Sequence, residues 1–298
     1  MLDYAALGAL AAVVREGSFE RAARALHVTP SAVSQRIRGL EERVGCALVL
    51  RGQPCRATEA GLRLCRHVDQ VRLLEQALHG SLPALAPAGE ARVPLPVAVN
   101  ADSLATWAGP ALAAFAADQP VLMAVTVDDQ EHTAEGLRSG AVLAAVTGSA
   151  QPAAGCNSRP LGAMRYHAVA SPGFVARHFG DGVGPASLAR APSLQFNAKD
   201  TLQARWAQRL CRAPVALPRH SLPSPEAFVT AALHGMGWGL QPEALVAAHL
   251  ASGALVELVP GTPLDVALHW QHARAASALL DRLTGAVLAA AAAALRPP

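Results

Sequence analysis

Residues 18–45, which read SFERAARALHVTPSAVSQRIRGLEERVG, decide the fold of the N-terminal part of this chain. The stretch contains two signals for the start of a helix, Ser18 before Phe19 and Thr29 before Pro30. Ser and Thr side chains cap the free backbone N–H groups of a helix start, and proline is tolerated at the first helical position. The stretch therefore predicts two short helices joined by a tight turn, the arrangement that places a helix in the major groove of DNA.

Helical spacing of apolar residues orients the second of these helices. Val33, Ile37, Leu40 and Val44 recur at intervals of four, three and four residues, so we expect them on one face, against the core. Small polar and basic side chains are left on the opposite face. A matching first helix is predicted over residues 4–15.

The polar face and the cap before it provide candidate DNA contacts: Thr29, Ser31, Ser34, Gln35 and Arg38. Gln bonds adenine and Arg bonds guanine bidentately, so we expect Gln35 and Arg38 to read bases. Ser31 lies beside the helix N-terminus, where free N–H groups favour a phosphate. The alternative is that this face is polar only because it meets solvent. The tight turn and the matching apolar faces of the neighbouring helices favour a DNA-binding role over this alternative.

A short β-hairpin is predicted directly after these helices. Residues 48–50 are typical of an apolar strand, residues 52–54 are typical of a turn, and residues 55–57 follow as the returning arm of the hairpin. We expect this hairpin to act as a wing beside the DNA, with three side chains near the phosphate backbone: Arg51, Gln53 and Arg56.

A long helix is predicted to follow the wing, capped by Thr58. Its apolar residues lie 3.5 positions apart on average: Leu64, Val68, Val71, Leu74 and Leu78. This spacing is typical of paired helices, so we expect an arm that joins two copies of the chain. Packing of the helix on its own domain is the alternative.

The distribution of charge agrees with a DNA-binding N-terminal part. The chain has 298 residues and a formal net charge of +3. Residues 1–80 hold eleven arginines and eight acids, whereas residues 81–298 hold fourteen basic and fourteen acidic residues. All of the excess positive charge therefore lies where phosphates would be neutralised.

Residues 1 to about 85 resemble the winged helix-turn-helix and linker helix of the LysR-type transcriptional regulators. The resemblance is carried by residues 17–45, Leu48, Arg51 and residues 58–61. It implies a sequence-specific DNA-binding regulator, since family members are about this long and carry a C-terminal effector domain. Val49 departs from the family pattern, where many members have Phe, but it keeps an apolar residue in the strand.

Further stretches resemble one branch of that family, which controls basic amino-acid export and related genes: residues 25–38, 53–58, 100–107 and 270–272. The resemblance implies a small-molecule effector, lysine or arginine, and a target gene for an amino-acid exporter or for metabolism. It also implies double-stranded promoter DNA, a homodimer or homotetramer, and RNA polymerase as partners.

Beyond residues 81–96, which carry four prolines, stretches typical of strands and helices alternate. We expect strands at 93–99, 121–127, 142–147, 165–170, 193–196 and 264–270, and helices at 103–117, 131–139, 200–211, 225–234 and 277–295. This alternation predicts an α/β architecture with largely parallel sheets.

The predicted fold class is α+β overall, in three parts: a winged helix-turn-helix DNA-binding domain at 1–58, a linker or dimerisation helix and hinge at 59–90, and an α/β effector-binding domain at 91–298. The resemblance implies that the last part has two subdomains of the periplasmic-binding-protein type with a ligand cleft between them. Subdomain I would cover about 91–163 and 266–298, and subdomain II about 164–265.

Ligands of open α/β sheets bind beyond the carboxyl ends of strands. Polar residues at or near the predicted strand and helix junctions are candidate effector contacts: Asn100, Asp102, Ser103, Asp128, Asp129, Thr147, Asp200 and Glu226. A helix start at residues 100–103 suits a carboxylate, and the acids of residues 128–131 suit a cation. Together they suit lysine or arginine, although Asp102, Ser103 and residues 128–131 could instead be helix caps.

The sequence lacks the residue patterns that several other functions require. We find no Gly-rich phosphate loop, nucleophile elbow or metal-ligand spacing, and therefore expect no enzyme, no catalytic residues, no metal and no cofactor. Five cysteines without paired spacing, no signal peptide and no apolar run of about 18 residues indicate a cytoplasmic protein without a membrane partner. The alternatives are an origin-binding inhibitor of chromosome replication initiation, and a regulator that responds to another small molecule.

Overall fold

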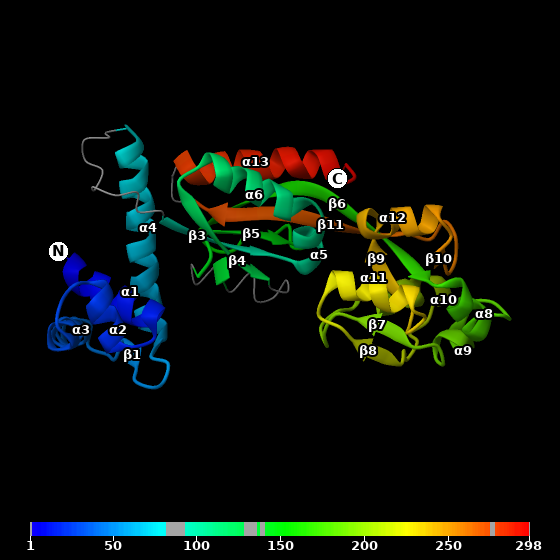
Figure 1. Ribbon diagram of the computed structural model, residues 1–298, viewed down its shortest axis with the longest axis horizontal. Helices are drawn as coiled ribbons and strands as arrows, with labels where there is room; N and C mark the ends of the chain where they lie inside the picture. Colours follow the sequence, from blue (N-terminus) through cyan, green and yellow to red (C-terminus); the bar gives the residue numbers. More distant parts are fainter. Residues whose placement is uncertain (1, 82–92, 128–135, 138–140, 275–277, 298) are drawn as a thin grey trace.

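The computed structural model describes residues 2–81, 93–127, 136–137, 141–274 and 278–297. Figure 1 shows a small helical unit at the N-terminus, a long helix that rises beside it, and a larger α/β region that contains the C-terminus. Among the described residues, no helix is both long enough and apolar enough to span a bilayer.

The N-terminal unit consists of five elements: α1 (Tyr4–Glu16), α2 (Phe19–Ala25), α3 (Pro30–Val44), β1 (Val49–Leu50) and β2 (Arg56–Ala57). Its predicted caps are confirmed. The Ser18 side chain accepts from the Arg21 N–H, the Thr29 side chain accepts from the Ala32 N–H, and Gly17 ends α1 in the left-handed conformation. These local signals act within a few residues, which explains why the sequence predicted them well.

The apolar stripe of α3 packs against α1 and α2. Val33, Ile37 and Leu40 are buried in a common core with Leu7 and Leu10 of α1. Val44, which we expected in this core, is exposed. It is the last residue of α3, and the chain turns away at Gly45 before the stripe completes another turn.

Helix α4 (Glu59–Ser81) begins at the wing, where the Thr58 side chain accepts from the Gly61 N–H at 3.1 Å. Gly61 lies directly against the wing, because a Cβ at this position would be 2.0 Å from the Leu48 carbonyl oxygen. Further along α4, Val68 is buried against the N-terminal unit, whereas 49% of Leu74 is exposed.

The α/β region contains a seven-stranded sheet of β3 (Val93–Val99), β4 (Val121–Val127), β5 (Ala144–Thr147), β6 (Cys156–Ala170), β9 (Gly239–Pro242), β10 (Val256–Glu257) and β11 (Leu264–Ala273). The strand order is β10-β6-β11-β5-β3-β4, and β9 also pairs with β6. Two short strands, β7 (Ser193–Gln195) and β8 (Arg219–Ser221), form a separate parallel pair.

The expected predominance of parallel pairing is wrong for the large sheet. Strand β3 pairs in parallel with β4 and β5, but β11 pairs antiparallel with β5 and β6, and β6 pairs antiparallel with β9 and β10. The reason is that β6 and β11 are long strands that run in opposite directions along each other over ten residue pairs, with residues 171–263 inserted between them in the chain.

Nine helical segments cover the described part of this region: α5 (Ala101–Ser103), a π-helix η2 (Leu104–Ala108), α6 (Gly109–Asp118), α8 (Pro172–His178), α9 (Pro185–Leu188), α10 (Leu202–Cys211), α11 (Pro225–Leu233), α12 (Glu243–Ala251) and α13 (Ala278–Ala294). The expected helix at 103–117 therefore starts two residues earlier and contains a π-turn. Elements α8, α9, α12, β8, β9 and β10 were not predicted. Most of the expected helix at 131–139 lies outside the described residues.

Strands β6 and β11 connect the two halves of the α/β region (Figure 1). Their pairing contains an irregularity between Leu268 and His269, opposite residues 160–162. Gly162 has a φ of +120°, and a Cβ there would be 2.4 Å from the carbonyl oxygen of Arg296. The subdomain boundaries that we propose, 163/164 and 265/266, fall beside this irregular segment.

Candidate DNA-binding surface and ligand cleft

The outer face of α3 presents the side chains that we expected to contact DNA. Ser31, Gln35 and Arg38 are exposed, and Ser34 is half-buried. Thr29 is exposed as well, but its hydroxyl already caps α3 and lies 3.0 Å from the Ser31 hydroxyl. Gln35 and Arg38 therefore have the freer side chains on this face.

Two hydrogen bonds from backbone N–H groups join the wing region to the helices. The Glu41 carboxylate of α3 accepts from the Leu48 N–H at 2.8 Å, and the Cys55 N–H donates to the Gly17 carbonyl at 2.9 Å. Arg51, Gln53 and Arg56 are exposed on the wing, and the Arg51 guanidinium lies 5.5 Å from the centre of the Phe19 ring. The hairpin thus leaves both arginines exposed, with Arg51 next to α2.

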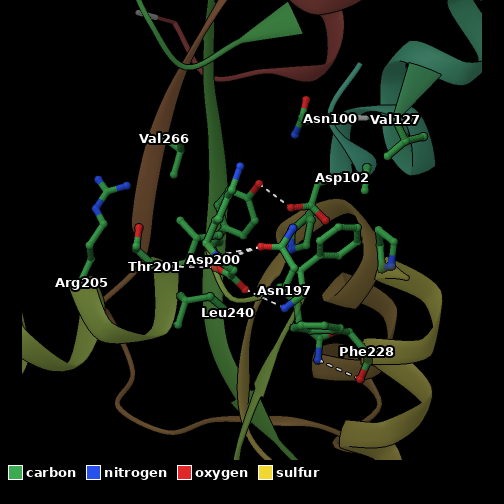
Figure 2. Close-up of a pocket in the computed structure, with 18 of the residues that line it drawn as sticks. Asn100, Asp102, Val127, Asn197, Asp200, Thr201, Arg205, Phe228, Leu240 and Val266 are labelled. Carbon is green, nitrogen blue, oxygen red and sulfur yellow. Dashed lines mark hydrogen bonds between the residues drawn. The ribbon is translucent and has the colours of Figure 1, made fainter. Parts of the chain in front are cut away.

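A cavity of about 730 Å³ lies between the two halves of the α/β region. Figure 2 shows its lining, which comes from the ends of β3 and β4, from β6, β9 and β11, and from α10 and α11. The lining residues are Asn100, Ala101, Asp102, Val127, Tyr166, Phe196, Asn197, Ala198, Lys199, Asp200, Thr201, Leu202, Arg205, Pro225, Phe228, Leu240, Gln241, Pro242, Val266 and Leu268.

Asp102 is the carboxylate most strongly affected by this cleft. The Tyr166 hydroxyl donates to its Oδ2 atom at 2.8 Å. Burial raises the pKa of Asp102 to about 6; the Tyr166 hydrogen bond opposes the rise, while the nearby charges of Asp200 and Glu226 add to it. A carboxyl group with this pKa is a common mark of a functional site, since burial of a charge is costly unless a partner arrives.

Asp200 also lines the cleft, but its carboxylate holds the local turn together. One oxygen accepts from the Phe196 N–H at 2.9 Å and the other from the Leu202 N–H at 3.0 Å. Asn197 accepts from the Lys199 N–H at 2.8 Å in the same turn. These bonds account for the position of α10, whose first turn faces the cavity.

Two amide side chains bring buried acceptors to the cleft wall. The Oδ1 atom of Asn100 and the Oε1 atom of Gln241 are buried and, within the described part of the chain, have no hydrogen-bond partner. The amide nitrogen of Gln241 donates to the Phe228 carbonyl at 3.3 Å, which orients that side chain. A buried unpaired acceptor is costly, so both atoms are suited to a donor from a ligand.

Of the effector residues predicted from sequence, Asn100, Asp102 and Asp200 line the cavity. Ser103 and Thr147 are buried outside that lining, and the Thr147 hydroxyl accepts from the Ser149 N–H at 2.9 Å. Glu226 lies next to the lining residue Pro225 and accepts from the Ser224 hydroxyl at 2.9 Å. Asp128 and Asp129 lie outside the described residues.

Six polar lining residues were not among the effector contacts predicted from sequence: Tyr166, Asn197, Lys199, Thr201, Arg205 and Gln241. Tyr166 and Gln241 lie within strands, and strand-end reasoning does not select such residues. Trp107, Trp238 and Trp270 are buried in the core. No group of three or more potential metal-ligating side chains occurs among the residues that the structure describes.

Comparisons with known families agree with both parts of the fold. A model described as a bacterial regulatory helix-turn-helix protein of the lysR family matches residues 4–62, and a model described as a LysR substrate binding domain matches residues 88–292. The chain therefore belongs to the LysR family of transcriptional regulators.

Regulators named ArgP and LysG are similar to this chain over nearly its whole length, which confirms the branch resemblance. The chain is 48% identical to ArgP of Pseudomonas aeruginosa, over 98% of this chain and 96% of that protein. It is 46% identical to LysG of Mycobacterium tuberculosis, over 97% and 94%.

Two solved structures resemble this fold closely. ArgP from Mycobacterium tuberculosis has a TM-score of 0.87 at 44% identity, with 100% of each chain covered. Full-length LysG from Corynebacterium glutamicum with bound effector Arg has a TM-score of 0.76 at 39% identity, covering 99% of this chain and 100% of that one.

Proposed function

We propose that this regulator acts in the cytoplasm, binds promoter DNA through α3 and the wing, and responds to a basic amino acid, arginine or lysine, in the cleft. The observation that carries the effector proposal is the Asp102 carboxylate on the cavity wall, which accepts from the Tyr166 hydroxyl and whose pKa is raised by burial to about 6. The similar LysG structure with bound Arg supports the same class of ligand.

For DNA, we assign base reading to Gln35 and Arg38, because they are exposed on the outer face of α3 and can bond adenine and guanine bidentately. Ser31, Ser34, Thr29, Arg51, Gln53 and Arg56 would then position the phosphate backbone. The exposed Leu74 on α4 supports our proposal that this helix pairs two copies of the chain.

For the effector, Asn100, Asp102 and Asp200 line the cleft and form the core of the proposed site. We also propose Asp128, Asp129 and Glu226 as neighbouring charges, and Ser103 and Thr147 as supports of the strand ends. An amino acid in this cleft can alter DNA binding only by binding one arrangement of the two subdomains better than another. The target we propose is a gene for an amino-acid exporter or for amino-acid metabolism.

Calorimetric titration at pH 7.5 with arginine, lysine, histidine and glutamate tests the effector class. We expect saturable binding of arginine or lysine and no heat of binding with glutamate, because a second carboxylate would be repelled by the acids around the cleft. Binding of glutamate, or of no basic amino acid, would contradict the proposal.

A further inference from the structure

The acidic groups around the cleft differ in what their oxygens already bind. Both carboxylate oxygens of Asp200 accept backbone N–H groups, and Glu226 is engaged by the Ser224 hydroxyl beside the cavity lining. In Asp102, the Tyr166 hydroxyl occupies Oδ2, and the described residues supply no hydrogen bond to Oδ1. Of the two acids that line the cavity, Asp102 therefore is the one with a carboxylate oxygen that no described residue engages.

Two further buried acceptors belong to residues that line the cavity. Asn100, two residues before Asp102, and Gln241 of β9 each have a buried side-chain oxygen without a partner in the described part of the chain. Figure 2 shows Asn100 and Asp102 on the same side of the pocket. Ammonium and guanidinium groups carry three and five N–H donors and no acceptor, so they fit a wall made of acceptors.

The opposite wall has the complementary charge. Lys199, in the turn before α10, and Arg205, in the first turn of α10, both line the cavity, and Figure 2 shows Arg205 on the other side of the pocket from Asp102. The sequence reading placed the effector's carboxylate at residues 100–103, at a helix start. In the structure, α5 has only three residues there and contributes the Asp102 carboxylate itself, which would repel such a group.

We infer that Asp102 is the residue by which the cleft selects a positively charged effector. The Asp102 oxygen that no described residue engages accepts an N–H of the effector's ammonium or guanidinium group, and Tyr166 holds the carboxylate in position. Binding displaces the proton that Asp102 carries in the empty cleft at acid pH. The inference rests on the proposed function and adds the orientation of the ligand, with its carboxylate toward Lys199 and Arg205.

The proton balance follows from the groups that face Asp102. The groups that act on its charge are Tyr166 from β6, Asp200 from the turn before α10 and Glu226 from α11, while Lys199 and Arg205 line the same cavity. Burial and the two acids favour the neutral form of Asp102, whose pKa is raised to about 6. A bound cation favours the charged form, so each ligand bound well below pH 6 releases close to one proton to the buffer.

Calorimetry with arginine at pH 5.5, in two buffers of different ionisation enthalpy, measures this release directly. A pKa of about 6 means that roughly three-quarters of a proton should be released per arginine, and that arginine should bind about tenfold more weakly at pH 5 than at pH 7.5. In Asp102→Asn, we expect the release to disappear and the affinity at pH 7.5 to fall at least about tenfold. Asp181→Asn, which changes an exposed carboxylate outside the cleft, is the matched control and should behave as the parent protein.

Tyr166→Phe keeps the ring and removes the donor to Asp102. Because that hydrogen bond lowers the pKa of Asp102, the loss of affinity on acidification should begin at a higher pH in this variant, with affinity at pH 8 retained within about threefold. A purely structural role for Asp102 would leave the pH profile of Tyr166→Phe unchanged, which would overturn the inference even if Asp102→Asn failed to fold.

Two analogues identify the cationic group that meets Asp102. Nα-acetylarginine keeps the guanidinium and lacks the α-ammonium, whereas citrulline keeps the α-ammonium and has a neutral ureido group in place of the guanidinium. Proton release with either one supports the inference and assigns that cation to Asp102. If arginine binds Asp102→Asn and the parent protein equally and releases no proton, the inference fails and the proposed effector class stands. Failure of every basic amino acid to bind the parent protein would instead contradict the proposed function.

Discussion

The Tyr166 hydroxyl donates a 2.8 Å hydrogen bond to Asp102, although 64 positions separate the two residues in the chain. This bond joins the middle of β6 to the turn that follows β3, and both residues line the cavity between the two halves of the α/β region. The cleft therefore brings together a carboxylate from one half and a strand that runs through both.

Asp102 should make the empty cleft less stable at neutral pH. Its pKa in the folded protein, about 6, lies above the ordinary aspartate value of 3.8, so the folded state binds the proton more tightly and the free energy of unfolding falls as pH rises from about 4 to 6. We expect Asp102→Asn to raise the stability of the ligand-free protein at pH 7.5 by about 1–3 kcal/mol. Thermal unfolding at pH 5 and 7.5 checks this, and an equal or larger gain at pH 5 would contradict it.

Gly61 should be required for the junction between the wing and α4. A Cβ at this position would lie 2.0 Å from the Leu48 carbonyl oxygen, so Gly61→Ala must move backbone and should destabilise the N-terminal unit by about 2 kcal/mol or more. Gly8→Ala is the matched control, since no neighbouring atom lies within 4 Å of its Cβ and alanine favours a helix by roughly 0.5–1 kcal/mol. Urea unfolding of both variants should show opposite signs, and a neutral Gly61→Ala would refute the close contact.

Gln35 and Arg56 should affect DNA binding in different ways. We expect Gln35→Ala to relax preference at one base pair by about 1–3 kcal/mol, because the exposed amide reads a base edge. Arg56→Ala should weaken all sequences alike and lower the slope of log affinity against log salt by about one, as loss of one phosphate contact does. Competition binding with a panel of single-base operator variants separates the two; a uniform loss in both mutants would remove Gln35 from base reading.

Leu74 should matter for self-association and little for folding. Its side chain is 49% exposed on α4, at a position of the 3.5-residue apolar repeat. Leu74→Glu should therefore shift the protein toward monomer in sedimentation velocity while its circular dichroism is kept. Leu62→Glu changes an exposed leucine, 40% accessible, that is outside the repeat, and should leave the assembly intact. Equal behaviour of the two variants would argue against pairing through this helix.

The sequence was most informative where the determinants are local. Caps at Ser18, Thr29 and Thr58, and the αL glycine at Gly17, act over three or four residues, so the N-terminal helices and the wing were predicted nearly to the residue. The strand β6 was predicted only from Arg165, because Pro160 and Gly162 interrupt its pattern while its pairing with distant β11 sustains it.

The cleft was predicted in outline and misread in detail. Asn100, Asp102 and Asp200 were found because they follow strands, but Tyr166 and Gln241 line the cavity from within strands. Only the antiparallel pairing of β6 with β9, which places His167 beside Gln241, brings that amide to the cavity wall. A long-range register of this kind has no local sequence signal.

The most direct test of a ligand-responsive regulator is a footprint of the full chain on the promoter of its own gene, with and without arginine, lysine or glutamate. Since coupling between two sites is reciprocal, an effector that favours one arrangement of the cleft must change DNA binding. We expect arginine or lysine, but not glutamate, to change the length or the affinity of the protected region. Identical footprints under all conditions, or equal protection of AT-rich origin DNA, would contradict the account.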